Sequence, residues 1–302
     1  MNFGHAFFTL LVFPGLLYAV PAAWFLMWIE RKAAARMQGR IGPPFYQPFF
    51  DFIKLMDKRL LPRTGIEGLV MTGLPLLSVA GLLGSLAFLP VFQTGEKRAG
   101  DLILLAALIE IPPLCAVLAG FASRSIFGQV GAAREATLMI ASSLPFLISL
   151  FAMAVAAGSL SLDQIALQAT LGTRLLAVSA LVLCLPVKLR INPFSLANAE
   201  QEIYSGATTE YEGPRLALWE LAHGLEWVAL TGLVASLAWP WRTGIWAADA
   251  LVFMLLSLLI VLLLVLLAAG TGRLKIPQVA RFYCRWGFGV SMLALAASAL
   301  PL

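Results

Sequence analysis

The sequence has little charge and few cysteines. Only 12% of its 302 residues are charged and 60% are hydrophobic, whereas a soluble domain has about 25% charged residues. The cysteines Cys115, Cys184 and Cys284 occur singly, without a C-x-x-C motif, which argues against an iron-sulfur cluster or structural zinc held by this chain alone. Neither G-x-G-x-x-G nor G-x-x-x-x-G-K-S/T occurs, so no nucleotide-binding motif is recognisable. We therefore expect an integral membrane protein whose redox chemistry takes place in partners.

Internal repeats and low-complexity linkers are also missing. No self-similarity at a period of about 20 to 50 residues indicates a repeat array, and no polar segment divides the chain. Residues 1–302 are therefore predicted to form a single membrane domain.

Long apolar stretches dominate what is present. Eight of them approach or exceed the roughly 20 residues that a helix needs to cross a bilayer, the fifth being the shortest. They cover residues 6–29, 70–92, 101–121, 136–157, 174–187, 218–239, 246–269 and 283–300. Because they are continuously apolar and do not alternate, helices are favoured over a β-barrel. No Lys or Arg precedes Arg31, so the first stretch is interpreted as a retained span and not as a secretion signal. The predicted fold is all-α, a bundle of about eight transmembrane helices.

Positive charges are concentrated in alternate loops. With both termini outside, the inside loops are 30–69, 122–135, 188–217 and 270–282, and together with Arg285 they contain 17 of the 21 Lys and Arg residues. This asymmetry predicts a multi-pass protein of the cell inner (cytoplasmic) membrane. The net charge of +5 is thus sorted to one face, which indicates contact with lipid and partner proteins and not with nucleic acid.

The first inside loop combines a basic segment with an amphipathic one. Arg31, Arg36 and Arg40 can extend the first helix out of the membrane toward a partner, and the Gly and Pro residues at 39–44 end that helix. Residues 49–61 repeat apolar side chains at helical spacing, which predicts an amphipathic helix at the interface. The alternative is that the basic residues only set the topology.

The third inside loop is acidic. It contains Glu200, Glu202, Glu210 and Glu212 between two apolar stretches. A short helix is predicted to begin at 193–195, to hold the first two glutamates and to end near residue 206. A solvated charged face is the alternative, but carboxylates beside hydrocarbon are costly and mark functional sites.

Further ionisable residues lie inside the apolar stretches. Glu220, His223 and Glu226 follow one another at i, i+3 and i+6, and Glu110 lies near the middle of the third stretch. Each is expensive against lipid, so all are expected to face the bundle interior or a wet cavity. Clustered carboxylates raise one another's pKa and can exchange protons, so together with Glu135 and the four acidic-loop glutamates they predict a hydrated proton relay.

Two local alternatives apply to this relay. A di-metal site would need a second Glu-x-x-His pair, which is missing, so no metal is predicted. Glu135 could simply pair with its neighbour Arg134 at a helix start that favours acids.

The double proline at 112–113 is expected to disturb the third helix just after Glu110.

Two motifs carry a resemblance to a known family. The first is Glu30-Arg-Lys with Arg36-Met-Gln-Gly-Arg-Ile-Gly-Pro43 and Asp51-Phe-Ile-Lys54-Leu, and the second is Ala199-Glu-Gln-Glu202 with Thr209-Glu-Tyr-Glu-Gly213. In this order they resemble the membrane subunit shared by respiratory complex I (NADH dehydrogenase subunit 1) and the energy-converting membrane-bound NiFe hydrogenases of the Ech and formate hydrogenlyase types. The resemblance covers nearly the whole chain.

The resemblance implies a subunit, not catalytic by itself, that docks a hydrophilic redox arm and carries a glutamate-lined proton path. The docking loop would include Arg31, Arg36, Arg40, Asp51 and Lys54. A charge change near the redox centre would shift the acidic loop. No cofactor is expected in this chain; the NiFe centre and iron-sulfur clusters would belong to hydrogenase large and small subunits and a ferredoxin-like subunit. An antiporter-like membrane subunit and lipid would be further partners.

The hydrogenase branch is favoured over the quinone branch. In the quinone branch the stretch between Gly-Pro and Gln-Pro is longer, and here only residues 44–46 separate Pro43 from Gln47. The Gly131-Ala-Ala-Arg-Glu-Ala136 segment also resembles the hydrogenase branch, in which Glu follows Arg directly. The alternatives are a quinone-tunnel subunit of a proton-pumping NADH:quinone oxidoreductase, a stand-alone secondary transporter, and a purely structural anchor.

Overall fold

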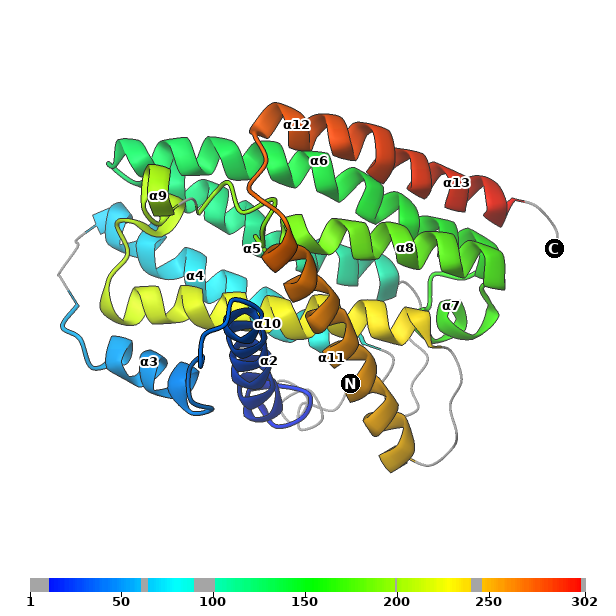
Figure 1. Cartoon of the computed structure of the whole chain (residues 1–302), viewed down its shortest axis with the longest axis horizontal. Helices are drawn as coiled ribbons and strands as arrows, with labels where there is room; N and C mark the ends of the chain where they lie inside the picture. The colour runs from blue at the N-terminus through cyan, green and yellow to red at the C-terminus, as the bar shows by residue number, and fades with distance from the viewer. Residues whose placement is uncertain (1–10, 61–64, 90–100, 199, 240–245, 300–302) are drawn as a thin grey trace.

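The computed structural model describes residues 11–60, 65–89, 101–198, 200–239 and 246–299, and within these ranges the secondary structure is entirely helical (Figure 1). The shorter elements are α3 (Gln47–Met56), α7 (Leu162–Gln168), α9 (Glu200–Ile203) and the 3-10 turn η2 (Gly206–Thr208). The long helices are α2 (Leu16–Met37), α4 (Gly65–Leu86), α5 (Asp101–Ala122), α6 (Ile126–Ala157), α8 (Leu171–Lys188), α10 (Gly213–Ala238) and α11 (Trp246–Gly270). The last run consists of α12 (Ile276–Phe282), the π-helical turn η3 (Tyr283–Gly287) and α13 (Phe288–Ser298).

Six described helices are long and apolar enough to cross a membrane: α4, α5, α6, α8, α10 and α11. The all-α membrane fold is therefore confirmed, and each of the six has a predicted counterpart. The predicted count of eight is not confirmed. The first predicted span corresponds to α2, but its residues 6–10 lie outside the described part and α2 continues into the charged segment as far as Met37. The last corresponds to the run from α12 to α13, which the π-helical turn interrupts.

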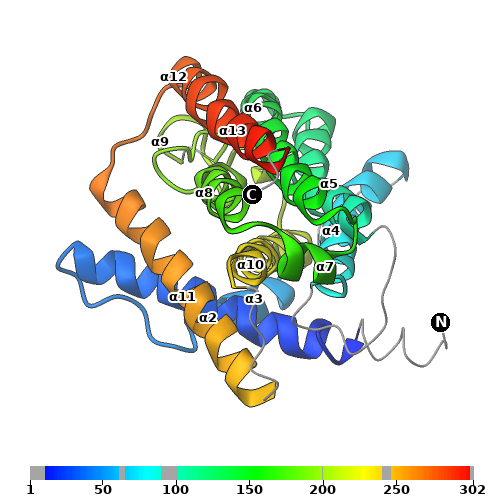
Figure 2. The ribbon, with the colours of Figure 1, turned by 90° about the vertical axis from the view of Figure 1, so that its right-hand side faces the viewer.

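Helix α10 forms the centre of the bundle. Figure 2 shows it nearly end-on, and it contacts α2, α3, α4, α8 and α11. In its most apolar stretch, 89% of the residues are buried, against 28% for the peripheral α11. Close packing requires a glycine where α2 crosses, because a Cβ on Gly224 would lie 2.9 Å from the sulfur of Met27. Polar side chains farther along α10, such as Glu226 and Thr231, are thus placed in the protein interior.

The segment between α8 and α10 folds back over α5 and α6 at η2. Gly206 has a φ of +56°, and a Cβ on Gly131 of α6 would lie 2.7 Å from its Cα. The chain can approach α6 this closely because residue 131 is a glycine, whereas Gly206 permits the positive φ and leaves room for the Ala197 carbonyl. We call the segment between α8 and α10, which carries Glu200, Glu202, Glu210 and Glu212, the acidic segment. Glycine therefore allows the acidic segment to pack against two membrane helices.

Several predicted boundaries were wrong. Helix α6 begins at Ile126, so most of the predicted loop 122–135 is helical, and α7 was not predicted. The span predicted at 101–121 agrees with α5, which holds the prolines 112–113 inside it and continues to Ala122; a neighbouring helix can satisfy the backbone that proline frees.

The short helix predicted to begin at 193–195 begins only at Glu200, as α9, and this helix does hold Glu200 and Glu202. At 193–195 the backbone serves tertiary contacts, since the Leu274 N–H donates to the Pro193 carbonyl at 3.0 Å and the Phe194 ring packs 5.4 Å from that of Tyr283.

Candidate functional site

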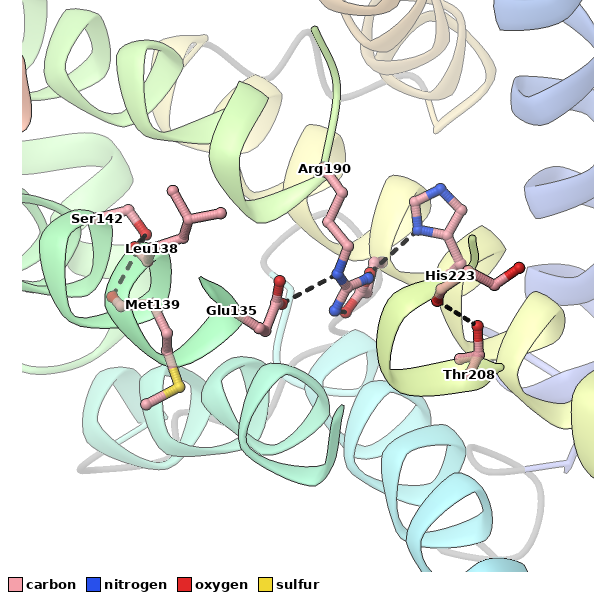
Figure 3. Close-up of polar contacts among 9 residues, drawn as sticks. Glu135, Leu138, Met139, Ser142, Arg190, Thr208 and His223 are labelled. Atoms are coloured by element: carbon pink, nitrogen blue, oxygen red, sulfur yellow. Dashed lines mark hydrogen bonds and ion pairs between the residues drawn. The ribbon is translucent and has the colours of Figure 1, made fainter. Parts of the chain in front are cut away.

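A buried arginine joins two membrane helices at the end of α8. Arg190 adopts a left-handed conformation with φ 54°, which turns the chain just after Lys188. Its Nε donates to Glu135 Oε1 of α6 at 3.0 Å, and its Nη1 and Nη2 donate to Glu226 Oε2 and Oε1 of α10 at 2.9 and 3.4 Å. Figure 3 shows Arg190 extended between Glu135 and His223. His223 Nδ1 lies 3.3 Å from Glu226 Oε2, so histidine and arginine share one carboxylate.

This arginine is a fixed cation. Burial lowers the pKa of Arg190, the neighbouring charges of Glu135 and Glu226 raise it, and the net result is a raised pKa. The Glu135 and Glu226 side chains are only 7% and 5% exposed. Within the described residues the Oε2 atom of Glu135 is buried without a hydrogen-bond partner. One carboxylate oxygen is therefore available to a proton or a water.

Lys188, two residues before Arg190, is a second buried cation. Lys188 Nζ lies 2.5 Å from Glu110 Oε1 of α5 and 3.4 Å from Ser143 Oγ of α6. The Ser143 hydroxyl donates to the other Glu110 oxygen at 2.8 Å, and the ammonium sits 4.5 Å from the Phe146 ring centroid. Glu110 thus has a partner that local sequence does not reveal.

Lys188 at the end of α8 and Arg190 just after it therefore pair with carboxylates from three other helices. We call Glu110, Glu135, Glu226, Lys188 and Arg190 the central charge cluster. When all three carboxylates are ionised, the two cations leave one negative charge, and His223 is the titratable group that contacts the cluster. Buried carboxylates that share cations in this way can hold and pass protons.

The local alternative for Glu135 was wrong. Arg134 points away from it and donates to Glu202 Oε2 at 2.7 Å and to the Leu196 carbonyl at 3.4 Å. Glu135 also does not lie at a helix start, because α6 begins at Ile126.

The acidic segment lies at the surface and at the start of α10. The hydrogen bond and the charge of Arg134 lower the pKa of the exposed Glu202. Glu200 opens α9, but its side chain lies outside the described part. Glu210 is half-buried, and Glu212 is the N-cap of α10 with its Oε1 buried and unpartnered among the described residues. The structure brings Glu202 to Arg134 and not to the central charge cluster.

Glu220 lies apart from His223 and Glu226. It is exposed and lines an open cavity of about 220 Å³ between α2, α3 and α10, together with Arg31, Asp51 and the apolar side chains Trp24 and Phe52. The three residues predicted to lie along one face of the helix are therefore separated: His223 and Glu226 lie in the interior, and Glu220 lies in this cavity.

The predicted docking residues also divide into two sets. Arg31 Nη1 lies 3.3 Å from Asp51 Oδ2, and Gln47 Nε2 donates to Asp51 Oδ1 at 2.8 Å, so this pair ties α3 to α2. The predicted amphipathic helix is confirmed as α3, which ends at Met56. Arg36, Arg40 and Lys54 are exposed. These three present their charges to the surface, whereas the charges of Arg31 and Asp51 are paired with each other.

Sequence reasoning missed the cations of the cluster. Lys188 and Arg190 were assigned to the positive-inside pattern because they follow an apolar stretch. The available signal was the carboxylates themselves, since a charge buried beside hydrocarbon needs a countercharge. Among the described residues no group of three or more His, Cys, Asp or Glu side chains could hold a metal ion.

Comparisons with known proteins place the chain in a family. Residues 9–299 match the NADH dehydrogenase family model. The chain is 34% identical to hydrogenase-4 component C of Escherichia coli K12, over 89% of this chain and 88% of that one. It is 29% identical to formate hydrogenlyase subunit 4 of the same organism, over 93% and 95%. It is 30% identical to one of the subunits of the NADH-quinone oxidoreductase of Thermomicrobium roseum, over 76% and 79%.

A solved structure has the same fold. A chain of the archaeal membrane-bound sulfane sulfur reductase, described as a respiratory membrane complex, superposes with a TM-score of 0.87 at 25% identity, covering 98% of this chain and 100% of that one. The names of all these relatives describe components of larger complexes. This multi-pass membrane protein therefore belongs to the NADH dehydrogenase family, together with the matching subunits of NADH-quinone oxidoreductase and of the hydrogenases.

Proposed function

We propose that this chain is the membrane-anchoring, ion-translocation-coupling subunit of an energy-converting membrane-bound NiFe hydrogenase. Both hydrogenase relatives align over most of the chain, one of them at 34% identity. Two features of the sequence support the same branch: the short stretch between Pro43 and Gln47, and a glutamate, Glu135, that directly follows Arg134. The chain itself would carry no NiFe centre or iron-sulfur cluster; those would belong to large, small and ferredoxin-like subunits on its inside face.

The central charge cluster carries this proposal. Buried ion pairs are weak as a source of stability, because desolvation offsets most of the attraction. We therefore attribute the burial of two cations and three carboxylates to a role in proton transfer and not to a gain in stability. Protons would pass among Glu202, Glu226, Glu110 and Glu135, and Glu200, Glu210, Glu212, Glu220 and His223 would complete the path. The acidic segment would respond to redox chemistry in the docked arm by changing these protonation equilibria.

The docking face would lie beside α3. Arg36, Arg40 and Lys54 are exposed there, and so are the aromatic side chains Phe45 and Phe50. Arginine and aromatic residues are enriched in protein interfaces. This face would lie on the cytoplasmic side of the cell inner membrane, and both termini would lie on the opposite side. An antiporter-like subunit would lie beside the bundle.

Glutamine substitution tests the proton path. Glu226→Gln and Glu135→Gln, each in the full complex, are expected to lower the number of protons translocated per electron while assembly is retained. Membrane vesicles with a pH-sensitive dye and a parallel hydrogen assay give this ratio. An unaltered ratio in both assembled variants contradicts the proposed path.

Co-purification separates the hydrogenase function from the second candidate, a quinone-tunnel subunit. That candidate is supported by the 30% identity to the quinone oxidoreductase relative and by the cavity between α2, α3 and α10. A NiFe large subunit in the purified complex supports the hydrogenase function. A quinone-linked NADH module, or quinone bound in the purified complex, supports the alternative. A chain that transports ions without any partner would contradict both.

A further inference from the structure

We infer that Lys188 is itself a proton-carrying residue of the path and that its ammonium group is the donor to Glu110. This inference rests on the proposed function, because it assigns a role within the same proton path. It adds a residue type that the carboxylate pattern does not contain.

The two cations of the cluster are held in different ways. Arg190 makes three N–H···O contacts with two carboxylates, and a guanidinium does not lose its proton in proteins. Lys188 contacts a single carboxylate, with a hydroxyl and a ring face as its other neighbours. An ammonium is a point charge on a flexible stem and can give up its proton when buried. Arg190 is therefore the fixed charge of the cluster, and Lys188 is the exchangeable one.

The Lys188–Glu110 pair is largely shielded from water. The Lys188 side chain is 5% exposed, and that of Glu110 is 22% exposed. In the transfer, an N–H bond of the ammonium breaks and an O–H bond forms at Glu110 Oε1, 2.5 Å away. The products are a neutral amine and a neutral carboxylic acid, so no net charge is created, and the desolvation cost of an ion pair disappears. The Ser143 hydroxyl contacts both groups and can remain hydrogen-bonded throughout.

The step forms a complete cycle. The pair returns to its ionised state when the amine takes up one proton and Glu110 releases one. Because uptake and release occur on different side chains from different helices, α8 and α5, each cycle moves one proton through the pair. The remaining members, Glu135 and Glu226, stay paired with Arg190 during this cycle.

Replacing lysine by arginine tests the inference because the positive charge is kept while the exchangeable proton is lost. In the full complex in membrane vesicles, Lys188→Arg is expected to reduce the number of protons translocated per electron at least tenfold. The matched control is Arg124→Lys, a swap between the same residue types in the exposed Arg124–Glu67 pair, which should leave the ratio unchanged. A normal ratio in assembled Lys188→Arg overturns the inference, because the charge alone would then suffice.

A second variant covers a failure of assembly. If Lys188→Arg does not assemble, the double variant Lys188→Met with Glu110→Gln removes both charges together and leaves no uncompensated ion. It is expected to assemble and to lose proton translocation, and normal translocation overturns the inference.

A third measurement needs no variant of Lys188. Infrared difference spectra of the wild-type complex should show a carboxylic acid C=O band that changes during turnover and is missing in Glu110→Gln. If no such band appears, the inference is likewise overturned.

The outcomes also separate the two levels of the proposal. A normal ratio in Lys188→Arg combined with a reduced ratio in Glu226→Gln rejects the inference and keeps the proposed function. Normal ratios in both variants reject the proposed proton path itself.

Discussion

At the scale of single residues, Arg190 determines whether the centre of the bundle is stable. Its replacement by methionine would leave Glu135 and Glu226 buried without a countercharge apart from His223. Removing one partner of a buried ion pair costs about 3–5 kcal/mol. We expect Arg190→Met to lower the unfolding temperature of the detergent-solubilised protein and to reduce its level in the membrane.

The control for this prediction is an exposed ion pair. Arg124, whose side chain is 83% exposed, pairs with Glu67, and such pairs contribute roughly 0–1 kcal/mol. Arg124→Met is therefore expected to leave the unfolding temperature nearly unchanged. Equal stability of the two methionine variants would show that the cluster is not held by Arg190.

The exposed pair of Arg134 and Glu202 has a predictable pH dependence. Hydrogen bonding and charge from Arg134 lower the pKa of Glu202 in the folded protein. The interaction is therefore fully present above the ordinary glutamate pKa of about 4.3, and it is lost as the pH falls through the lowered value.

Carboxyl-labelled glutamate in NMR titrations provides the measurement. The Glu202 signal should titrate below the ordinary range in the parent protein and return to that range in Arg134→Ala. A Glu202 signal that is unchanged by Arg134→Ala would show that the pair does not form.

At the scale of elements, the contact of η2 with α6 depends on glycine. A Cβ at Gly131 would lie 2.7 Å from the Cα of Gly206 and 2.9 Å from the amide nitrogen of Ala207, and these backbone atoms cannot yield as a side chain can. Overpacking of this kind costs about 1–3 kcal/mol. We expect Gly131→Ala to displace the acidic segment and to increase protease cleavage within residues 198–212.

Gly73 is the matched control, because it lies inside α4 and a Cβ there meets no atom within 4 Å. Alanine is favoured over glycine in a helix by about 1 kcal/mol, so Gly73→Ala should keep or raise stability. Equal cleavage in both variants would contradict close packing between η2 and α6.

The elements also show what a sequence can reveal. Helices α4, α5, α8, α10 and α11 were found because a bilayer imposes a length and an apolar composition that are read residue by residue. The early start of α6 was missed because its first turns contain polar and small residues that contact the acidic segment, and such contacts are tertiary. The turn of Arg190 was missed for the same reason, since nothing local to residue 190 predicts a left-handed arginine.

The carboxylates of the candidate site could be predicted from the sequence, but their ion-pair partners could not. Glu110 and Glu226 were identified because a carboxylate in an apolar stretch is conspicuous, whereas Lys188 at the end of such a stretch is ordinary. Glu220 has the same spacing as its neighbours and still lies in a cavity, because α2 and α3 leave space beside it. Pairing depends on how helices cross, and a single sequence does not contain that information.

At the scale of the whole molecule, the distribution of charge predicts the orientation. Since most Lys and Arg residues lie in the segments assigned inside, a periplasmic-type reporter enzyme fused after residue 302 should be active. The same reporter inserted at Gly39, in the exposed turn after α2, should be inactive. The reverse pattern would invert the topology and place the docking face on the opposite side of the membrane.

The bundle also has distinct inner and outer layers. Helix α10 is enclosed by its neighbours, whereas α11 lies at the edge of the bundle (Figure 2). Leucine side chains are exposed along most of the length of α11. Lipid or an adjoining membrane protein would contact α11 without reaching the central charge cluster. Partner contacts at this edge are therefore expected to affect assembly more than proton movement.

Lys188 and Arg190 are separated by only one residue, at the point where α8 passes into the acidic segment. A rotation of that short stretch would reposition both cations simultaneously, and would alter ion pairs on three other helices in one movement. A bound partner that displaces residues 189–198 could thus retune every member of the group from a distance, without contacting any of its carboxylates.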